Sequence, residues 1–162
     1  MREAQGGTWL FGIVILFVLL FSGYLAISMN MARAHTVKSN TLMILEKHNG
    51  LTPAALRELQ DYLDRVGYRN RQSCPSRVEI GMGRYVNWYG FRNGTISPAT
   101  GQYYLCILYI PTGATGEEVT SGYFRIRVSF HLDLPIFGEW FDMAITGETR
   151  TLFNPACPRG RC

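Results

Sequence analysis

The chain has 162 residues, of which 47% are hydrophobic and 13% aromatic. This content is enough for a packed core and excludes a disordered chain, and the length leaves room for one small domain beside a membrane segment. The formal net charge is +4, a moderate excess that favours contact with acidic surfaces and does not by itself indicate a nucleic-acid-binding protein.

The first predicted element is a membrane span. No charged residue occurs between Glu3 and Arg33, and residues 8–28 are almost wholly apolar. A helix needs about 20 apolar residues to cross a bilayer core, and a soluble helix is seldom apolar on every side. We therefore expect a short leader at residues 1–7, a transmembrane helix at residues 8–28 and the lipid bilayer as a partner. Within this helix, Gly12 and Gly23 would let another membrane helix approach closely.

The apolar run could also be the hydrophobic region of a signal peptide. The sequences Ala26-Ile27-Ser28 and Ala32-Arg33-Ala34 both fit a small-residue cleavage site. The length of the run and the weak charge of residues 1–7 favour a retained anchor. Flanking charges leave the orientation open, so the cysteines, which all follow the run, predict a cytoplasmic N-terminus and an extracytoplasmic C-terminal domain.

A stem is predicted directly after the span. No helix breaker occurs between Ser28 and His48, and Asn49-Gly50 is a typical helix stop. The sequence predicts one helix of about 40 residues, or about 60 Å, whose second part forms a stem at residues 29–50. The alternative is a pair of helices with a kink near Gly23 or Asn30.

A short amphipathic helix should follow the stem. Thr52 suits a helix cap and Pro53 the first helical position, and Gly67 is a suitable end. The leucine spacing predicts one buried face. That face consists of Leu56, Leu59, Leu63 and Val66.

Arginines and aromatic residues alternate between residues 68 and 92. The predicted patch could bind an acidic polymer or lipid headgroups, or it could be the solvated edge of a β-rich segment. Arginines with aromatics also suit single-stranded nucleic acid, but the spacing matches no reader motif and nucleic acid is not the favoured partner. The patch residues are Arg69, Arg71, Arg77, Arg84, Arg92 and Trp88.

Strands are predicted over the rest of the head, residues 51–153. Asn93-Gly94 is a strong hairpin signal, and strands at residues 103–110, 123–133 and 140–153 suggest an antiparallel meander, with Gly147 as a candidate bulge. The fold class is therefore α+β, with a sheet of about three to five strands. In the second strand, alternation places on the inner face Phe124, Ile126, Val128, Phe130 and Leu132.

The four cysteines allow three disulfide pairings. We favour Cys74–Cys106 and Cys157–Cys162, because the second pair is close in sequence and an even number fits an exported domain. Four free thiols or a zinc site are the alternatives. The prolines and glycine of the tail, residues 154–162, predict irregular structure.

Catalytic chemistry is not predicted. The histidines at 35, 48 and 131 are scattered, and no hydrolase, metalloprotease or phosphate-loop motif occurs. We expect no enzyme activity, cofactor or metal.

The order of leader, apolar helix, stem and α+β head resembles pilin-like proteins, and is most similar to the TadE-like pseudopilins of tight-adherence pili. The resemblance implies a pilin-like subunit or accessory protein of a surface pilus or secretion apparatus, held to other membrane-anchored subunits through the N-terminal helix. Substrates of prepilin peptidase carry a glycine before the cleaved bond and a glutamate five residues later. Gly6-Gly7 could supply the glycine, but Gly12 stands at the fifth position, so an uncleaved accessory subunit is expected. The alternative function is a membrane-tethered binding module that uses the basic patch.

Overall fold

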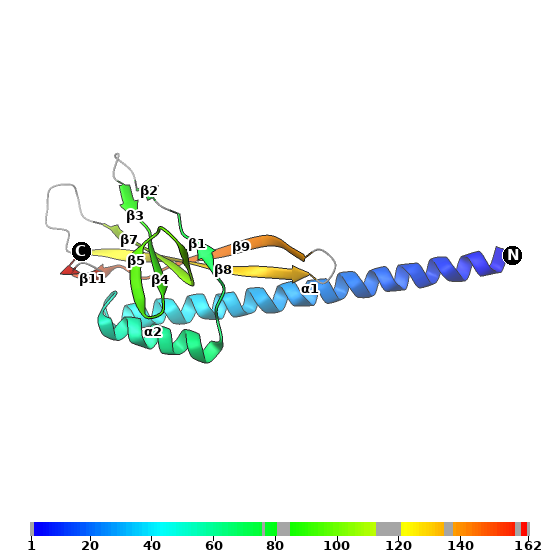
Figure 1. Ribbon diagram of the computed structural model, residues 1–162, viewed down its shortest axis with the longest axis horizontal. Coiled ribbons are helices and arrows are strands. Elements are labelled where there is room, and N and C mark those ends of the chain that lie inside the picture. Colours follow the sequence, from blue (N-terminus) through cyan, green and yellow to red (C-terminus); the bar gives the residue numbers. More distant parts are fainter. Residues whose placement is uncertain are drawn as a thin grey trace.

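The computed structural model describes residues 2–75, 77–80, 85–112, 121–134, 138–157 and 160–161. Its dominant element is α1, Arg2–Lys47, a single helix of 46 residues. The helix projects far beyond the β-sheet domain at its N-terminal end (Figure 1). The prediction of one long helix is confirmed, and the alternative with a kink near Gly23 or Asn30 is wrong.

The end of α1 is set by a paired capping arrangement. The Gly50 N–H donates to the Leu45 carbonyl at 2.8 Å and the Asn49 N–H to the Glu46 carbonyl at 3.3 Å, which is the Schellman pattern. Asn49 takes the left-handed conformation, with φ of 50°. The helix thus stops where Asn49-Gly50 predicts.

The second helix, α2, spans Pro53–Val66. Thr52 accepts a hydrogen bond from the Ala55 N–H at 3.1 Å, and Gly67 takes the left-handed conformation that ends the helix. The buried residues are Ala55, Leu59 and Leu63. The prediction for Val66 is wrong, because its side chain is 46% exposed; Ala55 is buried in its place.

The main sheet has six strands, and the predicted α+β class is confirmed. The hydrogen-bonded order is β10-β8-β7-β4-β5, with β9 also pairing with β8, and all the pairings are antiparallel. Consecutive pairing of β7, β8 and β9 forms the expected meander. The strands are β4 (Tyr89–Arg92), β5 (Thr95–Pro98), β7 (Leu105–Pro111), β8 (Ser121–Leu134), β9 (Gly138–Glu148) and β10 (Leu152–Phe153).

Short strands form three further pairs, β1 with β6, β2 with β3 and β11 with β12. The last pair lies in the tail, so the expectation of a wholly irregular tail is wrong. Ala156 exchanges backbone hydrogen bonds with Asn49 and Leu51 at 3.0 and 2.8 Å, which pairs this segment with the connection between the two helices. The strands are β1 (Gln72–Ser73), β2 (Arg77–Glu79), β3 (Tyr85–Asn87), β6 (Gln102–Tyr103), β11 (Ala156–Cys157) and β12 (Gly160–Arg161).

The hairpin predicted at Asn93-Gly94 joins β4 to β5. Both residues have positive φ, 50° and 70°, as a type I′ turn requires. The Gly94 N–H also donates to Gln60 Oε1 at 2.8 Å. This hydrogen bond holds the hairpin against α2.

Both faces of the sheet are buried at β7. On one face Leu105 and Ile107 join Phe124, Ile126 and Val128 of β8 in a core that includes both helices. On the other face Cys106, Leu108 and Ile110 form a smaller cluster with Trp88. The inner-face residues predicted for β8 are buried from Phe124 to Phe130. Ser129, which the alternation places on the outer face, is buried as well, and the side chain of Leu132 lies outside the described part.

The second half of α1 belongs to the core of the head. Ala34, Val37, Thr41, Ile44 and Leu45 are all buried against it. The segment predicted as the stem therefore forms the helical layer on which the sheet packs (Figure 1).

Gly147 lies where β9 crosses α1. A Cβ there would lie 2.8 Å from Lys38 Cδ and 3.0 Å from Leu42 Cδ1, so the absence of a side chain lets the strand approach the helix. The prediction of a bulge at Gly147 is wrong. The register instead shifts between Leu132 and Asp133.

Candidate functional site

Most of the exposed large hydrophobic residues in the described part of the chain lie on the first half of α1. Its large apolar side chains are exposed: Trp9 is 75% exposed and Phe17 is 67% exposed. Soluble proteins rarely expose an apolar surface of this extent. The helix is long and apolar enough to cross a membrane, although a signal sequence near the N-terminus meets the same criteria of length and composition.

The two candidate packing glycines differ in their surroundings. No atom lies within 4 Å of a Cβ placed on Gly12, and this residue lies in an open groove with Thr8, Trp9, Ile13 and Leu16. Gly23 is only half-exposed. Gly12 therefore offers free space to a neighbouring helix, whereas Gly23 is already partly covered.

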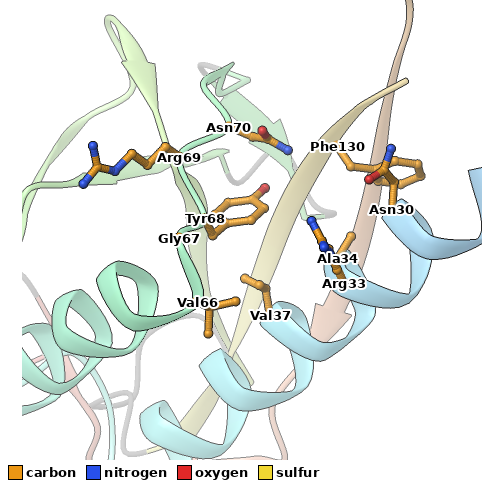
Figure 2. A pocket seen from close by; sticks show the side chains of 10 residues that line it. All are labelled: Asn30, Arg33, Ala34, Val37, Val66, Gly67, Tyr68, Arg69, Asn70 and Phe130. Carbon is orange, nitrogen blue, oxygen red and sulfur yellow. The ribbon is translucent and has the colours of Figure 1, made fainter. Parts of the chain in front are cut away.

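A cavity of about 240 Å³ lies at the base of the head, where α1 leaves the sheet. We call it the base cavity. Figure 2 shows side chains from α1, from the segment after α2 and from β8 around it. The lining residues are Asn30, Arg33, Ala34, Val37, Val66, Gly67, Tyr68, Arg69, Asn70 and Phe130.

Hydrogen bonds to one carbonyl hold the wall of the base cavity. The Tyr68 hydroxyl donates to the Ser129 carbonyl, and Asn70 Nδ2 donates to the same oxygen at 3.5 Å. Burial raises the pKa of Tyr68 to about 12, since the charged phenolate would lose its water. Tyr68 therefore stays protonated at neutral pH and acts as a structural donor.

The two arginines of the base cavity point in different directions. The guanidinium of Arg33 lies among Tyr68, Ala34 and Phe130, whereas that of Arg69 points away from the other lining residues (Figure 2). The cavity thus holds one cation and two amides from Asn30 and Asn70. This arrangement can bind a polar or anionic group, but it lacks a paired nucleophile and base.

The residues of the predicted basic patch come from several segments of the head. Arg69 and Arg71 are exposed on the segment after α2, Arg77 is exposed in β2, and Arg92 is half-buried at the end of β4. Trp88 is 4% exposed and packs in the small cluster beside Cys106, so its proposed role as a surface residue is wrong. Arg84 lies outside the described residues.

The disulfide Cys74–Cys106 is confirmed, with Cα atoms 5.5 Å apart. It ties the segment before β2 to the start of β7, beside Trp88. Cys157 lies in β11 and is not a free thiol. Its predicted partner, Cys162, lies outside the described residues.

A cluster of charged side chains joins the two helices. Lys47 Nζ and His48 Nε2 lie 2.9 and 2.6 Å from the carboxylate oxygens of Glu58. The hydrogen bond from His48, followed by that from Lys47, lowers the pKa of the Glu58 carboxyl. The cluster fixes α2 to the end of α1 and leaves no carboxylic acid poised for proton transfer at neutral pH.

Candidate metal-ligand groups were sought in the part of the chain that the structure describes. Within it no group of three or more His, Cys, Asp or Glu side chains comes together.

Another cavity, of about 520 Å³, lies between the start of α2, the β4–β5 hairpin and β11. Arg57 is the only charged residue among those that line it.

The base cavity is the feature that sequence reasoning missed. Asn30 lies far in the sequence from Tyr68 and Asn70, and none of the three belongs to a motif. The one available signal is that Asn30 and Arg33 are the first amide and the first cation after the apolar run.

Comparison with known proteins gives no significant match to a family model, a curated protein or a solved structure.

Proposed function

We propose that the protein is a non-enzymatic, membrane-anchored subunit or accessory protein of a surface pilus or secretion apparatus, similar to TadE-like pseudopilins. The observation that carries the proposal is the division of α1. One continuous helix exposes an apolar surface over its first half and forms the core of the head over its second half. A head joined to its anchor in this way keeps a fixed position relative to the span, as a subunit in an ordered assembly requires.

The orientation follows from the cysteines. Disulfides persist outside the cytoplasm and are rare within it, and Cys74–Cys106 connects the core of the head. We therefore place the head outside the cell membrane and residues 1–7 in the cytoplasm. The test is protease added to intact spheroplasts. Loss of the head supports this orientation, and protection of the head until lysis contradicts it.

Retention of the span is a separate part of the proposal. Because no glutamate follows Gly7 at the fifth position, we propose that prepilin peptidase does not process the chain. Mass spectrometry of the protein purified from membranes tests this. An intact N-terminus supports an anchor, whereas a mass that begins after Ser28 or Ala34 would show a cleaved signal.

Lateral assembly is proposed to use the groove at Gly12. Small residues let membrane helices approach closely, and the Gly12 groove is open. Gly12→Leu should remove crosslinked complexes from native membranes. Val14→Leu is the matched control, because Val14 is exposed on the same stretch of helix but lies outside the groove. Unchanged complexes in Gly12→Leu would exclude this contact, and a wild-type chain that never crosslinks would exclude assembly.

A further inference from the structure

The base cavity lies just beyond the end of the predicted span. Asn30 and Arg33 line it from α1, and they follow residue 28 by about 3 Å and about 8 Å of helix rise. The headgroup layer on each side of a bilayer is about 5 to 8 Å thick. In the proposed orientation, these two residues therefore lie at the level of the phospholipid headgroups on the head side.

The head covers one side of α1 at this level. Ile27 packs against the main core, and Asn30 is partly buried. Ser28 and Met29, which lie between them in the sequence, are exposed. Positions three residues apart share a helix face, so the head contacts that face. The base of the head is therefore placed at the bilayer surface.

The base cavity has exposed and buried lining residues. Arg33, Gly67 and Arg69 are exposed, whereas Ala34 and Tyr68 are buried. A group can thus enter from outside and contact the buried wall. The volume of about 240 Å³ is smaller than the about 300 to 1,000 Å³ of typical pockets for whole small molecules. The cavity therefore suits the headgroup part of a lipid and not an entire lipid.

The charge of the lining favours an anion. The ten lining residues, all within the described part of the chain, include Arg33 and Arg69 and no Asp or Glu. None of the ion pairs between described residues involves Arg33. Arginine binds a phosphate group through two parallel N–H···O hydrogen bonds. A headgroup that carries an ammonium group would find no acidic partner in this lining, so an anionic headgroup fits better than a zwitterionic one.

Two amides lie on the same cavity. Asn30 lines it from α1 and Asn70 from the segment after α2 (Figure 2). Asn70 Nδ2 donates to the Ser129 carbonyl at 3.5 Å, and an amide nitrogen carries a second N–H. The Asn30 and Asn70 side chains can therefore donate hydrogen bonds to phosphate oxygens beside the Arg33 guanidinium.

Apolar side chains border these polar groups. Ala34, Val37, Val66 and Phe130 also line the cavity, and Val66 is 46% exposed. Inorganic phosphate has no carbon atoms to bury against them, whereas the glycerol and first acyl carbons of a phospholipid gain from such burial. The combination of one cation, two amides and an apolar border favours a phosphate that is attached to lipid.

We propose that the base cavity binds the phosphate of an anionic phospholipid from the leaflet on the head side of the bilayer. Arg33 pairs with the phosphate, and the amides of Asn30 and Asn70 donate to its oxygens. The glycerol lies against Val66 and Phe130. This inference rests on the proposed function, because it requires α1 to span the membrane. The bound lipid fixes the base of the head to the bilayer surface.

The test is native mass spectrometry of the full chain in neutral detergent. The added probe is an equal mixture of phosphatidylglycerol and phosphatidylcholine with the same acyl chains. We expect the wild type to retain one phosphatidylglycerol in preference to phosphatidylcholine. Arg33→Gln should lower this retention by about ten- to a hundredfold, because it removes charge-assisted hydrogen bonds. Equal retention of the two lipids by the wild type would overturn the proposal.

Arg69→Gln is the matched control. It removes the same charge from the same cavity, but the Arg69 guanidinium points away from the other lining residues (Figure 2). This variant should retain phosphatidylglycerol as the wild type does. An equal loss in the two variants would show unspecific attraction of charge and overturn the site. Displacement of the lipid by excess inorganic phosphate would overturn the lipid as the ligand.

Extraction of wild-type membranes with alkaline carbonate tests the span separately. A chain that resists extraction but shows no preference for phosphatidylglycerol would overturn the lipid site and leave the proposed function standing. Release of the chain by carbonate would overturn the span and the lipid site together.

Discussion

The two halves of α1 have the same backbone but different surroundings. In the first half the large apolar side chains from Trp9 to Phe21 are exposed on all sides. In the second half a stripe of apolar residues from Ala34 to Leu45 is buried in the core of the head, whereas Met43 on another side of the helix is exposed. Both halves form a helix, so helix formation does not distinguish them. What differs is the distribution of apolar residues around the helix axis. Apolar residues on all sides suit a lipid environment, and apolar residues on one side suit packing against protein.

The largest expected effect comes from charging the first half. Leu16→Arg/Leu20→Arg places two cations near the centre of the apolar run, at a cost of about 5 to 7 kcal/mol for insertion. We expect the variant to be extracted from membranes by alkaline carbonate. The matched pair Ser39→Arg/Met43→Arg has the same spacing on an exposed face of the second half and should remain membrane-bound. Equal extraction of both would remove the distinction between the halves.

The stability of the head should fall when a buried side chain in the second half of α1 is made smaller. Leu45 is 0% exposed, so Leu45→Ala should destabilise the head by about 2 to 5 kcal/mol through lost burial and a cavity. Leu16→Ala is the control, because Leu16 does not contact the head core. Urea unfolding of the detergent-solubilised chain, followed by near-UV circular dichroism, measures both. A similar shift in the two variants would contradict the comparison.

A smaller effect is expected at Tyr68, near the border between the halves. Tyr68→Phe leaves the buried Ser129 carbonyl with only the 3.5 Å contact from Asn70, which should cost about 1 to 3 kcal/mol of stability. The wild type should also lose stability as the pH rises from 10 toward 12, because the pKa of Tyr68 is raised from 10.0 to about 12 in the folded state and the unfolded chain ionises first. Tyr68→Phe should lack the part of this alkaline loss that Tyr68 contributes, and an identical pH profile would contradict its role.

The smallest expected effect concerns the ion pairs between the end of α1 and α2. Since the pKa of Glu58 is lowered from 4.5, its contribution to stability is complete above pH 4.5 and is lost as the pH falls through the folded-state pKa. Glu58→Gln should therefore reduce stability at neutral pH and converge with the wild type in acid. Asp61→Gln, a change at an exposed position of the same helix, is the control. A constant difference at every pH would exclude the carboxylate as the cause.

Local signals in the sequence account for most of the fold. The uninterrupted run into Asn49-Gly50 predicts α1, Thr52-Pro53 predicts the start of α2, and Asn93-Gly94 predicts the hairpin. These features depend on the backbone preferences of adjacent residues, so they can be predicted without knowledge of the tertiary structure.

The wrong predictions concern residues whose surroundings depend on tertiary packing. Trp88 stands among arginines in the sequence, yet its burial depends on Cys106 and Leu108 from a strand nearly twenty residues later. Gly147 resembles a bulge residue, but its role is to let α1 approach β9. The base cavity likewise depends on three segments meeting, and no local pattern marks it.

The continuity of α1 has a mechanical consequence. In the proposed orientation, an unbroken helix would transmit a change of its tilt in the membrane to the head. From Ser28 to Lys47 the helix rises by about 30 Å, and an ordinary tilt of about 20° would carry its far end sideways by about 10 Å. In the proposed orientation, crowding among spans would therefore move the surface beside Asn49 and Ala156, at the end of α1 opposite the span.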